Sequence, residues 1–119
     1  VMSIATMSPA EVARVRGAAL LIDLHSMPPL RPAGQGAEFV VGDRFGASCA
    51  PALTALALRR LAAMDRRCAH NRPYSGGYGL DHHAAPRRGI HAIQIEVCRA
   101  SYLDARLDRA GPRLPAVAR

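Results

Sequence analysis

The sequence contains no lysine and no tryptophan, and all 16 of its positive side chains are arginines. The formal net charge is +7, which by itself would suggest an acidic partner. Aromatic residues make up only 4% of the chain, so the stacking platforms that bind single-stranded nucleic acid are nearly absent. The arginines are also dispersed along the chain rather than gathered into one arm. We therefore expect no nucleic-acid partner and interpret the charge as a solvated basic surface.

Long apolar runs are missing as well. No uninterrupted stretch approaches the roughly 20 residues of a membrane helix, and the first residues lack the pattern of a signal peptide. The three cysteines, Cys49, Cys68 and Cys98, have no CxxC spacing and are interpreted as reduced core thiols. With 119 residues, half of them hydrophobic, the chain fits a single domain over residues 1–119. These features predict a cytoplasmic protein without a membrane partner.

The first part of the chain predicts a helix followed by a strand. Ser8 has the form of a helix N-cap, with a proline after it and Glu11 placed to complete a capping box. A helix over Pro9–Gly17 follows. The apolar run Ala18–Leu24 is typical of a strand buried on both faces, and His25 stands where that strand is expected to end.

The middle of the chain is rich in proline, glycine and polar residues. Ser26–Ser48 is predicted to be a long loop with one extended piece, Glu38–Val41, and loops of that length are often functional. Pro51–Arg67 is the clearest helix. Its expected core positions are Leu53, Leu56, Leu61 and Met64. Asn71–Gly79, NRPYSGGYG, is dense in turn-forming residues.

The alternation in His91–Val97 predicts a second strand. One face carries Ile93, Ile95 and Val97; the other carries Gln94 and Glu96, which we expect to face a cleft or solvent. Residues from about 105 to 119 read as a frayed tail. The order of elements indicates an α/β fold, in which ligands bind beyond the carboxyl ends of the strands.

His25 and Glu96 form the best candidate site. His25 is either a structural histidine or a metal ligand whose ring Asp23 or Ser26 orients; Asp23 shares a strand face with it. Glu96 is either a solvent-facing carboxylate or the general base beside an activated water. Arg72 and Arg99 are surface cations unless one of them holds a substrate carboxylate. The adjacent His82 and His83 are interpreted as structural or surface residues. The motifs HExxH and GxSxG and the P-loop are absent.

Four blocks, LIDLHSMP, GDRFGASC, NRPYSGGY and GIHAIQIEVCRASYLD, resemble in order and spacing the C-terminal half of N-formylglutamate amidohydrolases. The resemblance implies a mixed sheet between helices, as in zinc carboxypeptidases and aspartoacylase. It implies hydrolysis of N-formyl-L-glutamate to glutamate and formate, a step of histidine degradation. It also implies that His25 is a Zn²⁺ ligand and Glu96 the base, with Asn71 and Arg72 lining the substrate pocket.

The same resemblance implies an incomplete site. The other two zinc ligands, a histidine and a nearby acidic residue, come from an upstream segment in the related families, so we expect a fragment of the domain. The isolated chain should bind zinc weakly and turn over nothing measurable. Two alternatives stay open: hydrolysis of another N-acyl amino acid or peptide on the same fold, and a non-catalytic basic binding module. If upstream strands are missing, the sheet should have an unpaired edge and an exposed apolar face.

Overall fold

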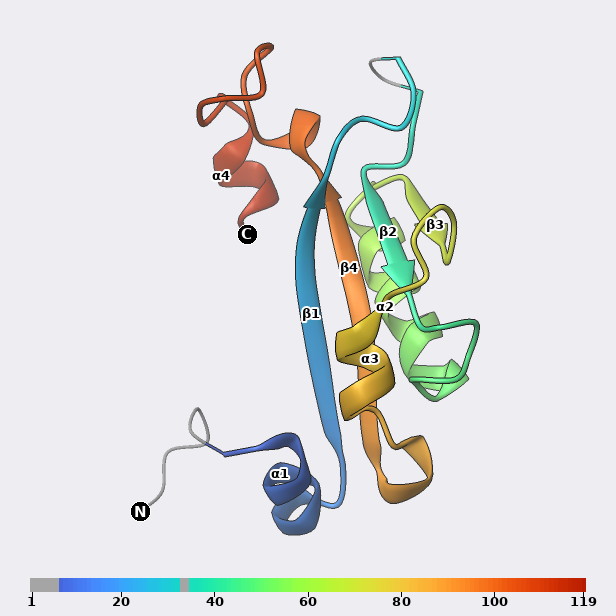
Figure 1. Ribbon diagram of the computed structural model, residues 1–119. Helices are drawn as coiled ribbons and strands as arrows, with labels where there is room; N and C mark the ends of the chain where they lie inside the picture. The colour runs from blue at the N-terminus through green and yellow to red at the C-terminus, as the bar shows by residue number, and fades with distance from the viewer. Residues whose placement is uncertain (1–6, 33–34) are drawn as a thin grey trace.

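A four-stranded mixed sheet forms the centre of the fold, in the order β1–β4–β2–β3 (Figure 1). The computed structural model describes residues 7–32 and 35–119, so two residues of the predicted loop, 33 and 34, lie outside the described residues. The strands are β1 (Ala19–Met27), β2 (Phe39–Gly42), β3 (Cys68–His70) and β4 (Ile90–Cys98). β1 is parallel to β4, β2 is antiparallel to β4, and β3 is parallel to β2. The predicted α/β class with a mixed sheet is confirmed.

The register divides the sheet into two faces. Paired residues on neighbouring strands point to the same side, and successive residues point to opposite sides. Asp23, His25, Glu96 and Val40 therefore share one side, which we call the site face. Ile22, Ile93 and Val41 project from the other side, which we call the back face.

Helices cover part of each face (Figure 1). α3 (Tyr78–His83) lies on the site face, where Gly79 approaches Asp23. α2 (Pro51–Ala63) covers the back face at β2 and β3, where Leu58 and Leu61 pack with Phe39 and Val41. The remaining helical segments are short: α1 (Pro9–Arg16), α4 (Leu114–Val117) and the 3₁₀ turns Pro86–Arg88 and Arg99–Ser101. No helix in the described parts of the chain is long and apolar enough to cross a membrane.

The start of α1 confirms the predicted capping box. The Glu11 backbone N–H donates to Ser8 Oγ at 3.2 Å, and the Ser8 backbone N–H donates to a Glu11 carboxylate oxygen at 2.7 Å. Gly17 ends the helix with φ of 86°, a left-handed conformation that glycine adopts without steric cost. The predicted bounds were therefore right to within one residue.

β1 differs from its prediction in two respects. It continues to Met27, so His25 lies inside the strand and not beyond its end. The prediction that both faces are covered was wrong, because β1 is the outer strand of the sheet and its apolar side chains on the back face are exposed. Leu20, Ile22 and Leu24 are 43%, 53% and 69% exposed on that side. The apolar run indicated a strand correctly, but it did not indicate what the strand packs against.

α2 also differs from its prediction. It ends at Ala63 and not at Arg67, and Asp65 follows with φ of 57°, a left-handed conformation that cannot continue a helix. Leu61 is buried as expected. Leu56 and Met64, predicted as core residues, are 43% and 58% exposed: Leu56 lies on the outer side of α2, and Met64 follows the end of the helix.

The strand β3 and the helices α3 and α4 were not predicted. β3 is only three residues long, too short for a periodic pattern, and α3 begins within the glycine-rich segment. The tail is not simply frayed, because Val117 of α4 packs against the core formed by Phe39, Val41 and Leu61. Cys49 and Cys98 are buried free thiols as expected, whereas Cys68 is only half-buried.

The exposed side chains of Leu20, Ile22 and Leu24, which we call the β1 stripe, lie beside the outer edge of β1, which pairs with no other strand among the described residues. Such an edge promotes association between chains. We expect Ile22→Lys to increase the monomer fraction of the 119-residue chain in analytical ultracentrifugation, because a charge at the centre of the stripe opposes edge-to-edge pairing. Val15→Lys, at an exposed valine of α1, should leave the distribution unchanged. A wild-type chain that is monomeric at all concentrations would contradict this expectation.

Candidate active site

The parallel pairing of β1 with β4 brings two chemically active side chains together. His25 and Glu96 are direct register partners, and so are Asp23 and Gln94 one pair earlier. All four side chains project from the site face. Residues 71 positions apart in the sequence are thus neighbours on two rigid strands.

Two carboxylates flank the imidazole of His25. Its Nε2 lies 2.9 Å from Asp23 Oδ1, within hydrogen-bond distance, and its Nδ1 lies 3.9 Å from Glu96 Oε1. An Nε2–H that donates to Asp23 leaves the Nδ1 lone pair free on the side of Glu96. This is the arrangement in which a carboxylate fixes the tautomer of a metal-binding histidine.

Glu96 is held in a buried position. Glu96 is only 7% exposed, and Gln94 Nε2 donates a hydrogen bond of 3.0 Å to Glu96 Oε1. Burial raises the pKa of the Glu96 carboxyl above its usual value. The nearby positive groups, His25 and Arg99, act to lower this pKa, and the negative charge of Asp23 acts to raise it further. A carboxylate with a raised pKa accepts a proton more readily, as a general base requires.

Close packing on the site face sets the position of Asp23. A Cβ added to Gly79 would lie 3.1 Å from Asp23 Oδ2, so the glycine lets α3 approach the carboxylate closely. Ser26 projects from the opposite face of β1 and is exposed, so Asp23 is the neighbour that contacts the His25 ring.

A catalytic zinc site uses three protein ligands and an open position. His25 Nδ1 fits the role of one such ligand, with Asp23 as its orienting carboxylate. Within residues 7–32 and 35–119, no group of three or more His, Cys, Asp or Glu side chains is arranged to hold a metal ion. The described residues therefore supply one candidate zinc ligand, His25 Nδ1, and not the three that a catalytic site needs.

Comparisons with known proteins identify the family of this chain. The family model for N-formylglutamate amidohydrolase matches residues 4–103. The chain belongs to the N-formylglutamate amidohydrolase family. N-formylglutamate deformylase of Pseudomonas aeruginosa is 35% identical over 102 residues, which cover 79% of this chain and 38% of that protein. The deformylase of Pseudomonas putida is 34% identical over 93 residues, covering 74% of this chain and 34% of that protein.

The fold comparison gives the same family. The crystal structure of an N-formylglutamate amidohydrolase from Ralstonia eutropha JMP134 superposes with a TM-score of 0.79 at 28% identity. The match covers 88% of this chain and 40% of the solved one. The chain thus spans between a third and two fifths of the length of these amidohydrolases.

The other residues predicted for an amidohydrolase site have contacts with residues other than His25 and Glu96. Asn71 is buried, and its amide is engaged with Asp43: Nδ2 donates to Asp43 Oδ1 at 2.8 Å, and Oδ1 accepts from the Asp43 backbone N–H at 2.9 Å. Arg72 is exposed and lies over the Phe45 ring, with Cζ 5.9 Å from the centroid. Substrate contact by Asn71 and Arg72 stays a prediction. His82 and His83 are exposed on α3.

Sequence reasoning missed a buried polar cluster centred on Asp43. The residue is 2% exposed, and besides Asn71 its carboxylate accepts a hydrogen bond of 3.1 Å from the Gly46 N–H and lies 3.1 Å from His70 Nε2. Burial acts to raise the pKa of Asp43, but hydrogen bonds, led by that of Asn71, hold the pKa below its usual value. The available signal in the sequence was the polar residues at the ends of two short strands: Asp43 directly follows β2, and His70 and Asn71 lie at the end of β3.

The Asp43 cluster should support the stability of the amidohydrolase fold. We expect Asp43→Asn to lower the free energy of unfolding at pH 7 by about 1–3 kcal/mol, because buried hydrogen-bond donors lose a charged acceptor. A folded pKa below the unfolded value of about 3.9 means that the stabilisation is present above that pH and is lost as pH falls through the folded pKa. The difference between wild type and variant should therefore shrink in urea unfolding at about pH 3.

Asp108→Asn, at an exposed aspartate, provides the control and should unfold like the wild type at both pH values. Equal stability of wild type and Asp43→Asn at pH 7 would show that the cluster is not stabilising.

Proposed function

We propose that this chain forms part of an enzyme that hydrolyses the formyl amide of N-formyl-L-glutamate to L-glutamate and formate. The observation that carries the proposal is the placement of His25 beside the buried Glu96, in a chain of the N-formylglutamate amidohydrolase family. The deformylases of the two Pseudomonas species support the choice of substrate by their names. A place in histidine degradation and a cytoplasmic location belong to the same proposal.

In this mechanism Glu96 acts as the general base. Its carboxylate takes a proton from water, whose oxygen attacks the formyl carbon, and the same carboxyl then delivers the proton to the amide nitrogen as the carbon–nitrogen bond breaks. Formate and the free amine of glutamate result. Gln94 holds Oε1 of Glu96 through its hydrogen bond, so the carboxylate keeps one orientation during both transfers.

His25 is proposed as one ligand of a zinc ion, through Nδ1. Zinc in such sites acts as a Lewis acid toward water and the amide carbonyl. The remaining ligands would have to come from outside the described residues. Asp23 keeps the His25 ring in the tautomer that leaves Nδ1 free.

Loss of the base tests the proposal most simply. In the product of the complete reading frame that contains this chain, Glu96→Gln should lower kcat for formate release by about 10²- to 10⁴-fold, because glutamine cannot accept the proton. Bound zinc should stay unchanged, as measured by atomic absorption, since Glu96 is not a proposed ligand.

Glu38→Gln is the matched control: this half-buried glutamate lies outside the site and faces Arg66 at 3.8 Å. Its kcat should stay near the wild-type value. N-acetyl-L-glutamate, assayed in parallel, separates deformylation from hydrolysis of other N-acyl amino acids. A Glu96→Gln enzyme that keeps its full rate, or a wild-type protein that prefers the acetyl substrate, would contradict the proposal.

A further inference from the structure

The helix α3 is too short to hold its own position on the sheet. It has six residues, no side chain caps its start, and isolated helices of this length are unstable in water. Its place on the site face must therefore come from contacts with other elements. Leu80 of α3 is fully buried and ties the helix to the core, and the backbone bridge between Ala85 and Ile90 ties the segment after it to β4.

Arg44, in the loop after β2, supplies contacts at the start of α3. Its Nε donates to Asp81 Oδ1 at 2.9 Å, and its Nη1 donates to Ser75 Oγ at 3.1 Å and to the Gly76 carbonyl at 2.9 Å. The Arg44 backbone N–H also donates to the Ser75 carbonyl, at 2.8 Å. The planar guanidinium suits this role, because arginine loses less side-chain freedom per hydrogen bond than a flexible amine does. One arginine thus joins the loop after β2 to α3 and to the residues before it.

The backbone at Arg44 has an uncommon conformation. Arg44 and Phe45 have φ of 54° and 56°, in the left-handed region, which is unfavourable for a residue with a side chain. Glycine would adopt this turn at a lower cost in free energy, but it would provide no guanidinium. Such a conformation persists when the surrounding contacts determine it strongly. The hydrogen bonds of Arg44 to the segment at α3 are contacts of this kind.

The position of α3 matters because its Gly79 packs against Asp23. A Cβ at Gly79 would lie 3.1 Å from Asp23 Oδ2, whereas Asp23 Oδ1 lies 2.9 Å from His25 Nε2. The helix therefore closes one side of the carboxylate, and the imidazole occupies the other. The Asp23 side chain is 35% exposed, so without α3 it would be free to adopt other rotamers and to bind water. Its hydrogen bond with His25 would then be weaker.

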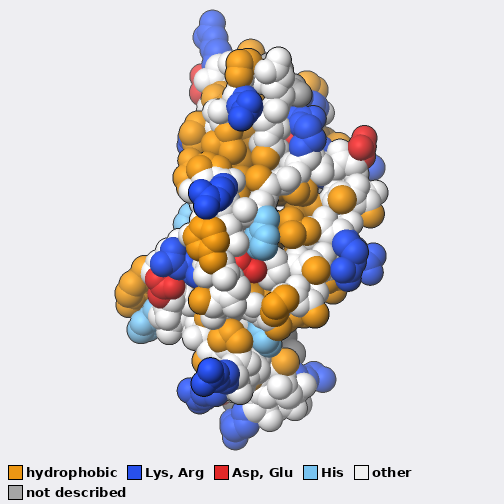
Figure 2. Space-filling model, turned by 90° about the vertical axis from the view of Figure 1, so that its right-hand side faces the viewer, with side chains coloured by type: hydrophobic (Ala, Val, Ile, Leu, Met, Phe, Trp, Pro, Cys, Tyr) orange, Lys and Arg blue, Asp and Glu red, His pale blue; other side chains and the backbone are white. Residues whose placement is uncertain are grey.

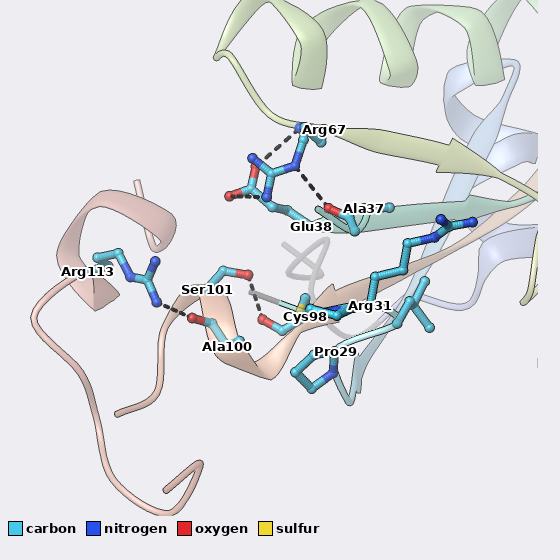
Figure 3. Close-up of a pocket in the computed structure, with 12 residues that line it drawn as sticks. Pro29, Arg31, Ala37, Glu38, Arg67, Cys98, Ala100, Ser101 and Arg113 are labelled. Carbon is cyan, nitrogen blue, oxygen red and sulfur yellow. Dashed lines mark hydrogen bonds and ion pairs between the residues drawn. The ribbon is translucent and has the colours of Figure 1, made fainter. Parts of the chain in front are cut away.

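Other arginines lack this link to the candidate site. On the side of the molecule in Figure 2, positive side chains lie apart from one another, separated by apolar and neutral atoms. In the pocket of Figure 3, Arg67 forms an ion pair with Glu38, and Arg113 donates to the Ala100 carbonyl. Within the part of the chain that the structure describes, Arg44 is the arginine whose side chain hydrogen-bonds to α3.

We propose that Arg44 is a positioning residue of the candidate active site. It holds the start of α3 on the site face, and Gly79 of α3 then keeps the Asp23 carboxylate turned toward the His25 ring. The orientation of this ring depends on the contacts of the chain alone, whereas an effect of Arg44 on catalysis rests on the proposed function.

The His25 ring of the 119-residue chain reports the orientation without substrate or zinc. When a neutral ring is held in one tautomer, its two ¹⁵N resonances lie far apart, and exchange between the tautomers brings them closer. Arg44→Gln should bring the two His25 resonances closer, because α3 then no longer confines Asp23. Hydrogen exchange of the Asp81 amide, which donates to the Gly77 carbonyl within α3, should become faster in the same variant.

Asp81→Asn removes the ion pair from the other side. It should change the His25 resonances in the same direction but by less, because the contacts of Arg44 with Ser75 and Gly76 remain. Asp81 is exposed, so this variant decides the question if Arg44→Gln does not fold. The double variant should resemble Arg44→Gln, since both changes remove the same link.

Arg67→Gln is the matched control, because it removes an arginine that pairs with Glu38 instead of α3. It should leave the His25 resonances unchanged. Unchanged resonances in both Arg44→Gln and Asp81→Asn, or an equal change in Arg67→Gln, would overturn the proposal.

The effect on catalysis is measured separately, in the product of the complete reading frame. There Arg44→Gln should lower kcat for formate release by about 2- to 30-fold at saturating zinc, with KM nearly unchanged, because Arg44 acts on the site through α3 and Asp23. A changed His25 ring together with an unchanged kcat would support the positioning of His25 and count against the proposed reaction alone.

Discussion

The parallel pairing of β1 with β4 is the constraint on which the site depends. It joins a segment near residue 25 to one near residue 96 and places His25 and Glu96 on the same face. A shift of one residue in this register would turn one of the two side chains to the opposite face. The two strands also differ in environment. β4 has neighbours on both sides and buries Glu96, whereas β1 is the outer strand and leaves the His25 side chain 46% exposed.

A second set of contacts holds the segment after β3 over the site face. A Cβ at Gly42 would lie 2.6 Å from the carbonyl carbon of Ser75, so only glycine at the end of β2 permits this approach. Asp43 then fixes Asn71 through two hydrogen bonds, and Arg72 follows directly. The buried carboxylate of Asp43 thus orders the backbone that carries Arg72.

The sequence predicted local structure well and spatial neighbours less well. The capping box of α1 and the shared face of Asp23 and His25 follow from fixed spacings, so they could be predicted without a fold. Glu96 was grouped with His25 from the chemistry of the two side chains, and the family resemblance then gave each a role. No local pattern indicates that β1 pairs with β4, so their direct pairing could not be predicted. Leu24 shows the same limit: its apolar run indicated a strand, but its 69% exposure depends on which elements pack beside it.

The most direct test of the central claim is the tautomer of the neutral His25 ring, measured by ¹⁵N NMR. The account predicts a proton on Nε2, bound to Asp23, and an unprotonated Nδ1 whose resonance shifts when Zn²⁺ is added. A ring protonated on Nδ1, or a zinc response at Nε2, would contradict the arrangement of His25 between Asp23 and Glu96.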